Sequence, residues 1–296
     1  MSKRKWSRKS TENIREALEV HDIHISANTI GEILKSMNYS LRSNRKTIAE
    51  TYHKDRDYQF QVIDRQKKKF KRLREPIVSI DSKKKEKIGN FKNPGKIWRN
   101  GYDDVLSHDF PFMATGKATP FGIYDIGQNN GAISIGTSYD TPEFAVDTVE
   151  SWLLSYGRLH YPHMKRLLIL CDSGGSNGYR CRAWKYFLYH KICIPHGISL
   201  TVCHYPTGAS KWNPIEHKLF SFISINWAGI PLRSLDIMRN CINGTNTKQG
   251  LTVDAIINTN LYEKGIKISK DEMDDIPITW GRELPQWNYT VSPKKR

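Results

Sequence analysis

The sequence has no long hydrophobic segment. Its longest purely apolar run covers residues 167–171, only five residues, whereas a helix needs about 20 to cross a bilayer. The first six residues, Met-Ser-Lys-Arg-Lys-Trp, lack the apolar stretch of a signal peptide. We therefore expect no membrane partner and no export.

Cysteine is scarce and its spacing carries no metal motif. None of the five cysteines forms a Cys-x-x-Cys pair, and the spacing of Cys181, Cys193, Cys203 and His204 matches no zinc-binding pattern. An odd number of cysteines without an export signal is typical of reduced thiols inside the cell. These cysteines are therefore predicted to be small hydrophobic side chains.

Acidic residues are outnumbered. The 296 residues include 46 Lys and Arg against 30 Asp and Glu, a net charge of +16. Residues 1–76 hold 19 basic and 10 acidic side chains, so a quarter of the chain carries more than half of the excess. A basic surface of this size attracts polyanions, above all nucleic acid. The length suggests about two domains.

The N-terminal region reads as two short helices. Ser10 and Ser26 are suitable N-caps, and each precedes apolar residues at helical spacing, Ile14, Ala17 and Leu18 in the first helix and Ile30, Ile33, Leu34 and Met37 in the second. This pattern predicts a small helix-turn-helix DNA-binding domain over residues 1–56. The alternative is a small helical domain with ordinary surface polarity.

Polar groups at the start of a recognition helix face base edges, and basic side chains beyond it contact phosphates. The candidate DNA contacts in this region are Asn28, Thr29, Arg42, Arg45 and Lys46. A basic helix over 57–75, ended by Pro76, is predicted to connect this region to the next domain.

Strand patterns begin after Pro76. Residues 77–81 form a short apolar run, and two alternating runs flank an Asn-Gly pair at 130–131, which is typical of a hairpin. A helix from Asp140, a non-alternating strand at 167–172, a helix around Trp184, a strand at 198–204 and a helix from Pro214 follow. This order predicts an α/β fold with a ribonuclease-H-like mixed sheet flanked by helices.

Three acids fall at chemically informative positions. Asp81 and Asp172 each end an apolar strand, and Glu216 opens an apolar helix. Like charges that converge at one end of a sheet do not favour folding, but they suit hard cations. The sequence therefore predicts that Asp81, Asp172 and Glu216 hold two Mg²⁺ or Mn²⁺ ions for phosphodiester chemistry, with no nucleophilic side chain required.

Other residues near these acids have two interpretations each. Asp125 is either an outer metal ligand or, as we favour, a satisfied polar group in the hairpin. The glycine-rich loop 174–178 is a phosphate cradle or, more in keeping with its lack of a P-loop ending, a strand-to-helix turn.

Six further residues are candidate accessories of the acid site. Lys83, Lys84 and Lys85 hold phosphates or form a solvated run, and His217 contacts the scissile phosphate or simply flanks Glu216. Trp212 stacks on an unpaired base or, as we favour, packs in the core. Asn213 follows Trp212 and, with Pro214, opens the apolar helix that carries Glu216.

At these residues the chain resembles a known family. The matching segments are IVSIDSKKKEKIGNF (77–91), TPFGIYDIGQNNGAISIG (119–136), DTPEFAVDTVESWL (140–153), LLILCDSGGSNGYR (167–180), TVCHYPTGASKWNPIEHKLFSFISINW (201–227) and WNYTV (287–291). They resemble DDE transposases of bacterial insertion sequences, most closely the Rhodopirellula-type transposase family. NPIE at 213–216 also resembles the corresponding helix start of mariner-like transposases.

The resemblance implies a catalytic triad of Asp81, Asp172 and Glu216 in a ribonuclease-H-like domain. It implies double-stranded DNA as partner, both terminal inverted repeats and target, a homo-oligomer on that DNA, and a bacterial cytoplasmic location at the nucleoid. Members of the family usually begin with a further helical DNA-binding region. The resemblance therefore implies that the present start is a truncation, an alternative start or the remnant of a decayed element.

The sequence thus predicts four regions and one leading function. The regions are a DNA-binding domain (1–56), a connector helix (57–75), a catalytic domain (76–230) and a C-terminal extension (231–296), to which we assign no chemistry. The predicted function is a DNA transposase in which water attacks at the element's ends and the freed 3′-OH then attacks target DNA. The alternatives are a truncated, catalytically silent DNA-binding remnant or repressor of its own element, and a general metal nuclease that joins nothing.

Overall fold

The computed structural model describes residues 7–42 and 53–294. The chain divides into two compact units, residues 1–48 and residues 49–296.

The N-terminal unit contains the two expected helices. α1 spans Thr11–Glu19 and α2 spans Ala27–Ser36. Ser10 and Ser26 are their N-caps, and each hydroxyl accepts a hydrogen bond from the backbone N–H three residues later. Both predicted caps are confirmed.

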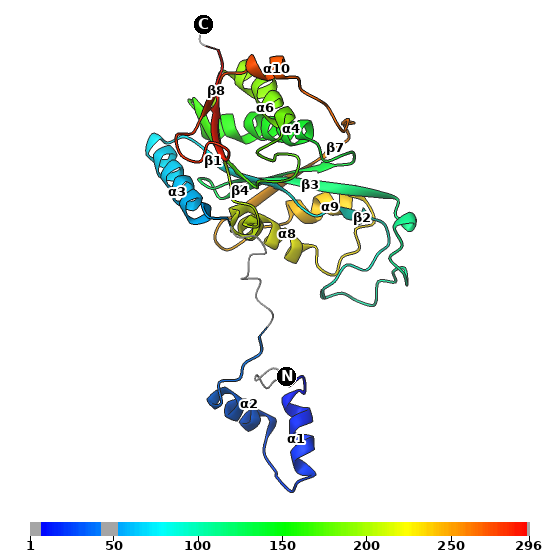
Figure 1. The fold of residues 1–296 in the computed structure, drawn as a ribbon. Coiled ribbons are helices and arrows are strands. Elements are labelled where there is room, and N and C mark those ends of the chain that lie inside the picture. Colours follow the sequence, from blue (N-terminus) through cyan, green and yellow to red (C-terminus); the bar gives the residue numbers. More distant parts are fainter. Residues whose placement is uncertain (1–6, 43–52, 295–296) are drawn as a thin grey trace. The chain divides into compact units, whose positions relative to one another are not determined.

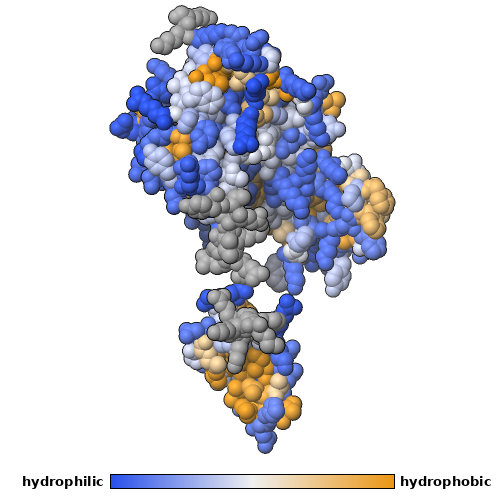
Figure 2. All heavy atoms as spheres, viewed as in Figure 1, coloured by the Kyte–Doolittle hydropathy of each residue, from blue (hydrophilic) through white to orange (hydrophobic). Residues whose placement is uncertain are grey.

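This unit buries little of its apolar surface. α1 has no buried residue, and α2 buries only Ile30. Ile33 and Met37, expected on the inner face of α2, are 45% and 59% exposed. Figure 2 shows the hydrophobic atoms gathered over these two helices. The described part of this unit therefore has almost no core of its own.

The second unit is built on a 9-stranded mixed sheet within the described residues. Its strands are β1 (Ile77–Ser82), β2 (Glu86–Ile88), β3 (Gly116–Asp125), β4 (Asn130–Gly136), β5 (Arg166–Cys171), β6 (Ser199–His204), β7 (Thr252–Asn258), β8 (Ile278–Trp280) and β9 (Asn288–Val291). They lie in the order β7-β4-β3-β1-β5-β6-β9-β8, and β2 pairs with β3.

The five central strands have the ribonuclease-H-like arrangement. β1 is antiparallel to β3, and β3 is antiparallel to β4 through the predicted hairpin. β1 is parallel to β5, and β5 is parallel to β6. The predicted α/β fold class is confirmed.

Helices cover both faces of the sheet (Figure 1). α4 (Pro142–Trp152) and α6 (Arg182–Phe187) lie on one face, and each continues into a π-helical turn, Leu153–Gly157 and Leu188–Cys193. On the other face lie the π-helical segment η5 (Glu216–Phe220), α8 (Ser221–Asn226) and α9 (Leu235–Asn243). The short helices α5 (Arg158–His160), α7 (Ile194–His196) and α10 (Lys270–Asp274) and the 3-10 turns η1 (Pro111–Met113) and η4 (Ser210–Trp212) complete the described elements.

The long basic helix is part of the second unit. α3 spans Arg56–Leu73 and buries Ile63 and Phe70 against β1 and β5, in a cluster that includes Ile77 and Leu168. Its polar and basic residues cover the rest of its surface. The helix thus packs on the same face of the sheet as Asp81.

The segment after residue 231 extends the sheet at both ends. β7 pairs in parallel with β4, and β9 pairs antiparallel with β6. The C-terminal segment, to which the sequence analysis assigns no chemistry, therefore adds strands on both sides of the five central strands.

The described residues show the state of the cysteines and the character of the helices. The five cysteines are all free. None of the helices there has the length and apolar character that a bilayer crossing requires.

Candidate functional site

Asp81 and Asp172 meet at the carboxyl ends of two neighbouring parallel strands. Ser79 on β1 is level with Leu170 on β5, and side chains two residues apart share a face of a strand. Asp81 and Asp172, each two residues further on, therefore project at the same level from the same face. Neighbouring strands lie only about 4.8 Å apart, so the fold brings these two predicted residues together.

Burial and mutual repulsion dominate the electrostatics of this pair. Burial is the largest cause of the raised pKa of Asp81, and the charges of Asp172 and Glu216 raise it further. Burial also raises the pKa of Asp172, while a hydrogen bond from Asn213 opposes that shift. Burial and the neighbouring negative charges therefore disfavour the ionised form of both carboxyl groups, and carboxyl groups perturbed in this way are typical of functional sites.

Glu216 approaches the same face from a helix. It begins η5, and its charge acts on both Asp81 and Asp172. The helix lies very close to the sheet because glycines face it: a Cβ added at Gly122 would lie 2.6 Å from Phe220, and one at Gly131 would lie 2.4 Å from Leu219.

Asn213 joins the helix start to both strands. Its amide Nδ2 donates to Asp172 Oδ1 at 3.2 Å and to the carbonyl of Ile80 at 3.2 Å. Its Oδ1 accepts from the Ser79 hydroxyl, and that hydroxyl accepts from the N–H of Ile215. Asn213 and Ser79 are fully buried, so this network fixes the helix relative to Asp172.

Ser79 is a residue of this site that was not predicted from the sequence. Its signal was available, because a polar residue two positions before Asp81 in an apolar strand lies on the same face as the acid. Its partner in the helix could not be read from the sequence, since the two residues are 134 positions apart.

The donor set fits a divalent cation in part. Mg²⁺ is usually bound by one or two carboxylates together with water and substrate phosphates, and Asp81 and Asp172 supply such a pair of half-buried oxygen ligands. No group of three or more His, Cys, Asp or Glu side chains in the described residues is arranged to hold a metal ion. Glu216 is therefore near the pair but does not complete a three-acid cage in this conformation.

Trp212 does not pack in the core, contrary to the interpretation that we favoured. Its side chain is 40% exposed. The guanidinium carbon of Arg56 lies 4.4 Å from its ring centroid, and the ring of Phe60 meets it edge-on. The residue stands at the surface immediately before Asn213.

The other accessory candidates make local contacts. The His217 side chain is exposed, and its Nε2 contacts the carbonyl of Lys211. Lys83 lies 5.1 Å from the ring centroid of Trp227. Burial lowers its pKa, and the charges of Glu86 and then Glu216 oppose that shift. Lys84 and Lys85 are exposed beside it.

The candidate DNA contacts of the N-terminal unit are at its surface where they are described. Asn28 and Thr29 are exposed at the start of α2, and the Thr29 hydroxyl also bonds the Ser26 cap. Arg42 is exposed, and its Nε donates to the Ser40 hydroxyl. Arg45 and Lys46 lie outside the described residues.

The two ambiguous features near the acids have structural explanations. Asp125 is buried and accepts from the N–H groups of Gly127 and Gln128 and from the Tyr161 hydroxyl, which confirms a satisfied hairpin residue. The 174–178 loop leads from β5 to α6, as expected of a strand-to-helix turn.

A buried polar network behind Asp172 was also missed. His204 Nδ1 contacts the carbonyl of Asp172 at 2.8 Å, and its Nε2 contacts the hydroxyl of Tyr289 on β9. Gln59 of α3 donates to the carbonyl of His204 and to Asn288. Burial lowers the pKa of His204 to about 4, so this histidine is neutral. Residues from both ends of the second unit thus support the strand that carries Asp172.

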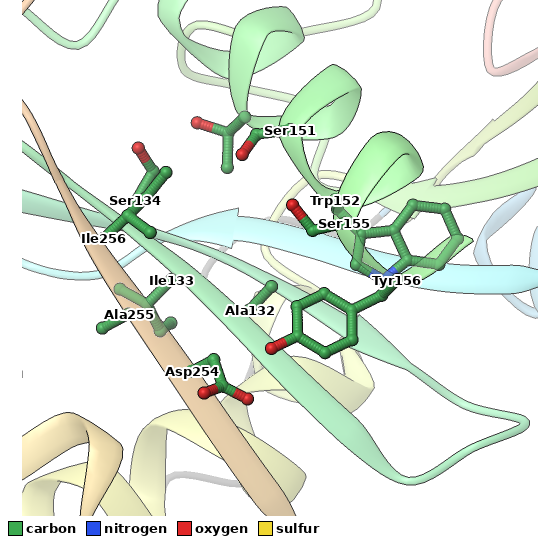
Figure 3. A pocket seen from close by; sticks show the side chains of 11 residues that line it. Ala132, Ile133, Ser134, Ser151, Trp152, Ser155, Tyr156, Asp254, Ala255 and Ile256 are labelled. Carbon is green, nitrogen blue, oxygen red and sulfur yellow. The ribbon is translucent and has the colours of Figure 1, made fainter. Parts of the chain in front are cut away.

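A hollow on the opposite face of the sheet is separate from the acids. It has a volume of about 200 Å³ and lies between α4 and strands β4 and β7 (Figure 3). Tyr156 points toward Asp254 at its mouth, and burial together with that carboxylate raises the pKa of Tyr156 to about 12. Ser134 on its wall faces the α4 side, whereas Asp81 faces η5.

A ribonuclease-H-like sheet with two acids at neighbouring strand ends and a third on the following helix defines a DDE-type transposase domain. The sequence profile described as "Rhodopirellula transposase DDE domain" matches residues 1–293. The chain belongs to this family of transposases, as the motifs of the sequence predicted.

Solved structures similar to this chain are transposase complexes. "Mos1 transposase paired-end complex with left transposon end" has 12% sequence identity and a TM-score of 0.47, and covers 81% of this chain and 71% of that chain. "Crystal structure of the mariner Mos1 paired end complex with Mg" has 15% identity and a TM-score of 0.46, with coverage of 81% and 72%. No curated protein sequence matches the chain.

Proposed function

We propose that this protein is a DNA transposase that cuts the ends of its insertion sequence and joins them to target DNA. In the first step a water oxygen attacks the phosphodiester at the element's end, and the 3′ oxygen leaves and takes up a proton. In the second step the resulting 3′-OH attacks a target phosphodiester and displaces another 3′ oxygen. The half-buried Asp81–Asp172 pair in a DDE transposase domain carries this proposal.

In this proposal Asp81, Asp172 and Glu216 are the catalytic residues and bind two Mg²⁺ or Mn²⁺ ions. Such ions, when bound, increase the nucleophilicity of the attacking oxygen and stabilise the leaving oxygen. Asp81 and Asp172 present their oxygens from one rigid sheet edge, and Glu216 approaches with the DNA. Asn213 holds Asp172 in place through its 3.2 Å hydrogen bond.

DNA binding in this proposal uses both units. The N-terminal unit is a helix-turn-helix domain that reads the terminal repeats with Asn28 and Thr29, while its basic side chains contact phosphates: Arg42, Arg45 and Lys46. Lys83, Lys84 and Lys85 hold phosphates next to the acids, and His217 contacts the scissile one. We also propose that the protein acts on double-stranded DNA as a homo-oligomer.

The test uses a pre-nicked duplex that carries the element's end, a target plasmid and Mg²⁺ or Mn²⁺. We expect joined product from the wild type and none from Asp172→Asn, which keeps its DNA affinity because the side chain changes by one atom. Chelation of the metal abolishes joining. Asp254→Asn, on the opposite face of the sheet, is the matched control and joins like the wild type.

The alternative function is a DNA-binding remnant or repressor without turnover. It predicts salt-sensitive binding and no metal-dependent product. Joining by Asp172→Asn at the wild-type rate would contradict the assigned site, and binding by the wild type without any product would favour the silent binder.

A further inference from the structure

Trp212 is an exposed tryptophan next in sequence to the hydrogen-bond network of Asp172. Trp184 and Trp152 in the same unit are fully buried, but Trp212 is 40% exposed. It directly precedes Asn213, the residue that bonds Asp172. A large apolar ring thus lies open at the edge of the proposed catalytic site.

The exposed ring is surrounded by positive charge. The Arg56 guanidinium carbon lies 4.4 Å from the ring centroid, and Lys211 Nζ lies 4.1 Å from it. Phe60 contacts the indole edge-on at 5.9 Å. Because Arg56 and Phe60 belong to α3, which is anchored on the sheet, the orientation of the ring is supported from a second element.

A hollow opens beside this ring. Its volume is about 390 Å³, within the range of ligand sites. It is lined by two aromatic side chains, Phe60 and Trp212, and by the polar side chains of His53, Lys54, Arg56 and Asp57. A flat ring that carries an anion complements such a surface, and a nucleotide of the DNA strand has this chemistry.

The relative strengths of the contacts favour a base over the present cation. An exposed cation–π contact changes an equilibrium constant about two- to fivefold, whereas stacking of a base on an aromatic side chain changes it about 5- to 150-fold. A base can therefore displace a flexible cation from the indole face. The displaced Arg56 or Lys211 side chain is then close enough to pair with the phosphate of the same nucleotide.

We propose that Trp212 and Arg56 form a stacking subsite for one nucleotide next to the scissile phosphate. The inference rests on the proposed function, since it places that phosphate at Asp81 and Asp172. It assigns Trp212 a positioning role: the residue holds the strand so that the scissile bond meets the acids.

The test is photo-cross-linking of the full chain, in the uncut complex of the Asp172→Asn variant. Each duplex carries one 5-iodouracil at a position that flanks the scissile bond, and the cross-linked peptide is identified by mass spectrometry. We expect one flanking position to cross-link at Trp212. Trp212→Ala in the same background abolishes that cross-link, and Trp212→Phe retains it. Trp98→Ala is the matched control, because Trp98 is fully exposed on the 89–116 segment.

Binding and joining give a second readout in the otherwise wild-type chain. We expect Trp212→Ala to bind the pre-nicked end about 5- to 150-fold more weakly, with recovery in Trp212→Phe and no change in Trp98→Ala. Cross-linking at other residues only, or wild-type binding by Trp212→Ala, would overturn the subsite. A Trp212 cross-link in a protein that joins nothing would support the subsite while refuting the transposase, and normal joining without that cross-link would do the reverse.

Discussion

At the scale of single residues, the site depends on a few buried polar groups rather than on the acids alone. Asp81 and Asp172 repel each other and lose hydration, so neighbouring groups must hold them in place. Asn213 does this for Asp172, with Ser79 as its own support. Groups of this kind orient catalytic ligands, and their loss typically reduces activity by about 10- to 100-fold.

Asn213→Ala tests this role. We expect joining to fall by about 10- to 100-fold and the free energy of unfolding to fall by about 1–3 kcal/mol, because the Ser79 hydroxyl is left buried without its acceptor. Because the Asn213 hydrogen bond lowers the pKa of Asp172, its loss also shifts the acid limb of the pH–rate profile to higher pH. Joining assays across pH and urea unfolding measure these effects. The exposed Asn240→Ala on α9 is the control, and an unshifted pH profile would show that Asn213 acts only on stability.

Lys185 gives a second prediction at this scale. It is buried, donates to the carbonyls of Tyr179 and Cys181, and lies over the ring of Tyr289. Burial lowers its pKa to about 8, from 10.5 in the unfolded chain. Between these values the unfolded state holds a proton that the folded state has lost, so stability rises with pH.

We therefore expect the free energy of unfolding of the wild type, relative to Lys185→Met, to increase by on the order of 2 kcal/mol between pH 7.5 and 9.5. Urea unfolding at several pH values measures this difference. A difference that stays flat or declines over this range would show that Lys185 keeps its proton in the folded protein.

At the scale of elements, the position of Glu216 depends on how closely its helix approaches the sheet. The helix rests on strand positions that have no side chain, Gly122 on β3 and Gly131 on β4. A Cβ added at either glycine would lie within 3 Å of a side-chain atom of the segment that carries Glu216, so that side chain or the helix itself has to shift. The glycines therefore determine the reach of Glu216 toward Asp81 and Asp172.

Gly122→Ala tests this dependence. Its methyl group would lie 2.6 Å from the Phe220 side chain and 2.9 Å from the Ile215 side chain, so these side chains, and the helix with them, are pushed away from the sheet. We expect a loss of about 1–3 kcal/mol in stability and of about 10- to 100-fold in joining, with DNA affinity unchanged. Thermal unfolding, joining and binding assays separate these effects.

Gly116→Ala is the matched control for that variant. Gly116 lies on the same strand, and an added Cβ there meets nothing within 4 Å. We expect it to join DNA like the wild type. If both variants joined normally, the close approach of the helix would have no role in placing Glu216.

At the scale of the whole molecule, the two units differ in how they are held together. The second unit has extensive cores on both faces of its sheet. The described part of the N-terminal unit buries one residue on its helices and displays apolar groups, as Figure 2 shows. In the proposed function the second unit performs the chemistry and the first selects the DNA.

Deletion of the N-terminal unit tests this division. We expect a chain of residues 53–296 to join a pre-nicked duplex in the presence of Mg²⁺ and to lose its preference for the element's end over a scrambled duplex. Without Arg42, Arg45 and Lys46, the slope of log K against log salt becomes shallower by about 3. Competition binding at several salt concentrations measures both changes. A truncated chain with the full preference would place the selectivity in the second unit.

The sequence by itself determined most helices and strands and the positions of the acids on them. Strand and helix patterns depend on local periodicity, so the order of the central strands, the caps Ser10 and Ser26 and the positions of Asp81 and Asp172 could be predicted. One boundary was shifted by a residue: Thr141, rather than Asp140, caps α4. Both residues are good N-caps, and only backbone geometry distinguishes them.

Tertiary structure alone decided which distant residues meet. The bond from Ser79 to Asn213, the support of Asp172 by His204 and Tyr289, and the exposure of Trp212 beside Arg56 all join segments far apart in the chain. The strands of the C-terminal segment likewise pair with β4 and β6 across long separations. Local patterns indicate which side chains of a segment become buried. Which other segment covers those side chains depends on the packing of the whole sheet.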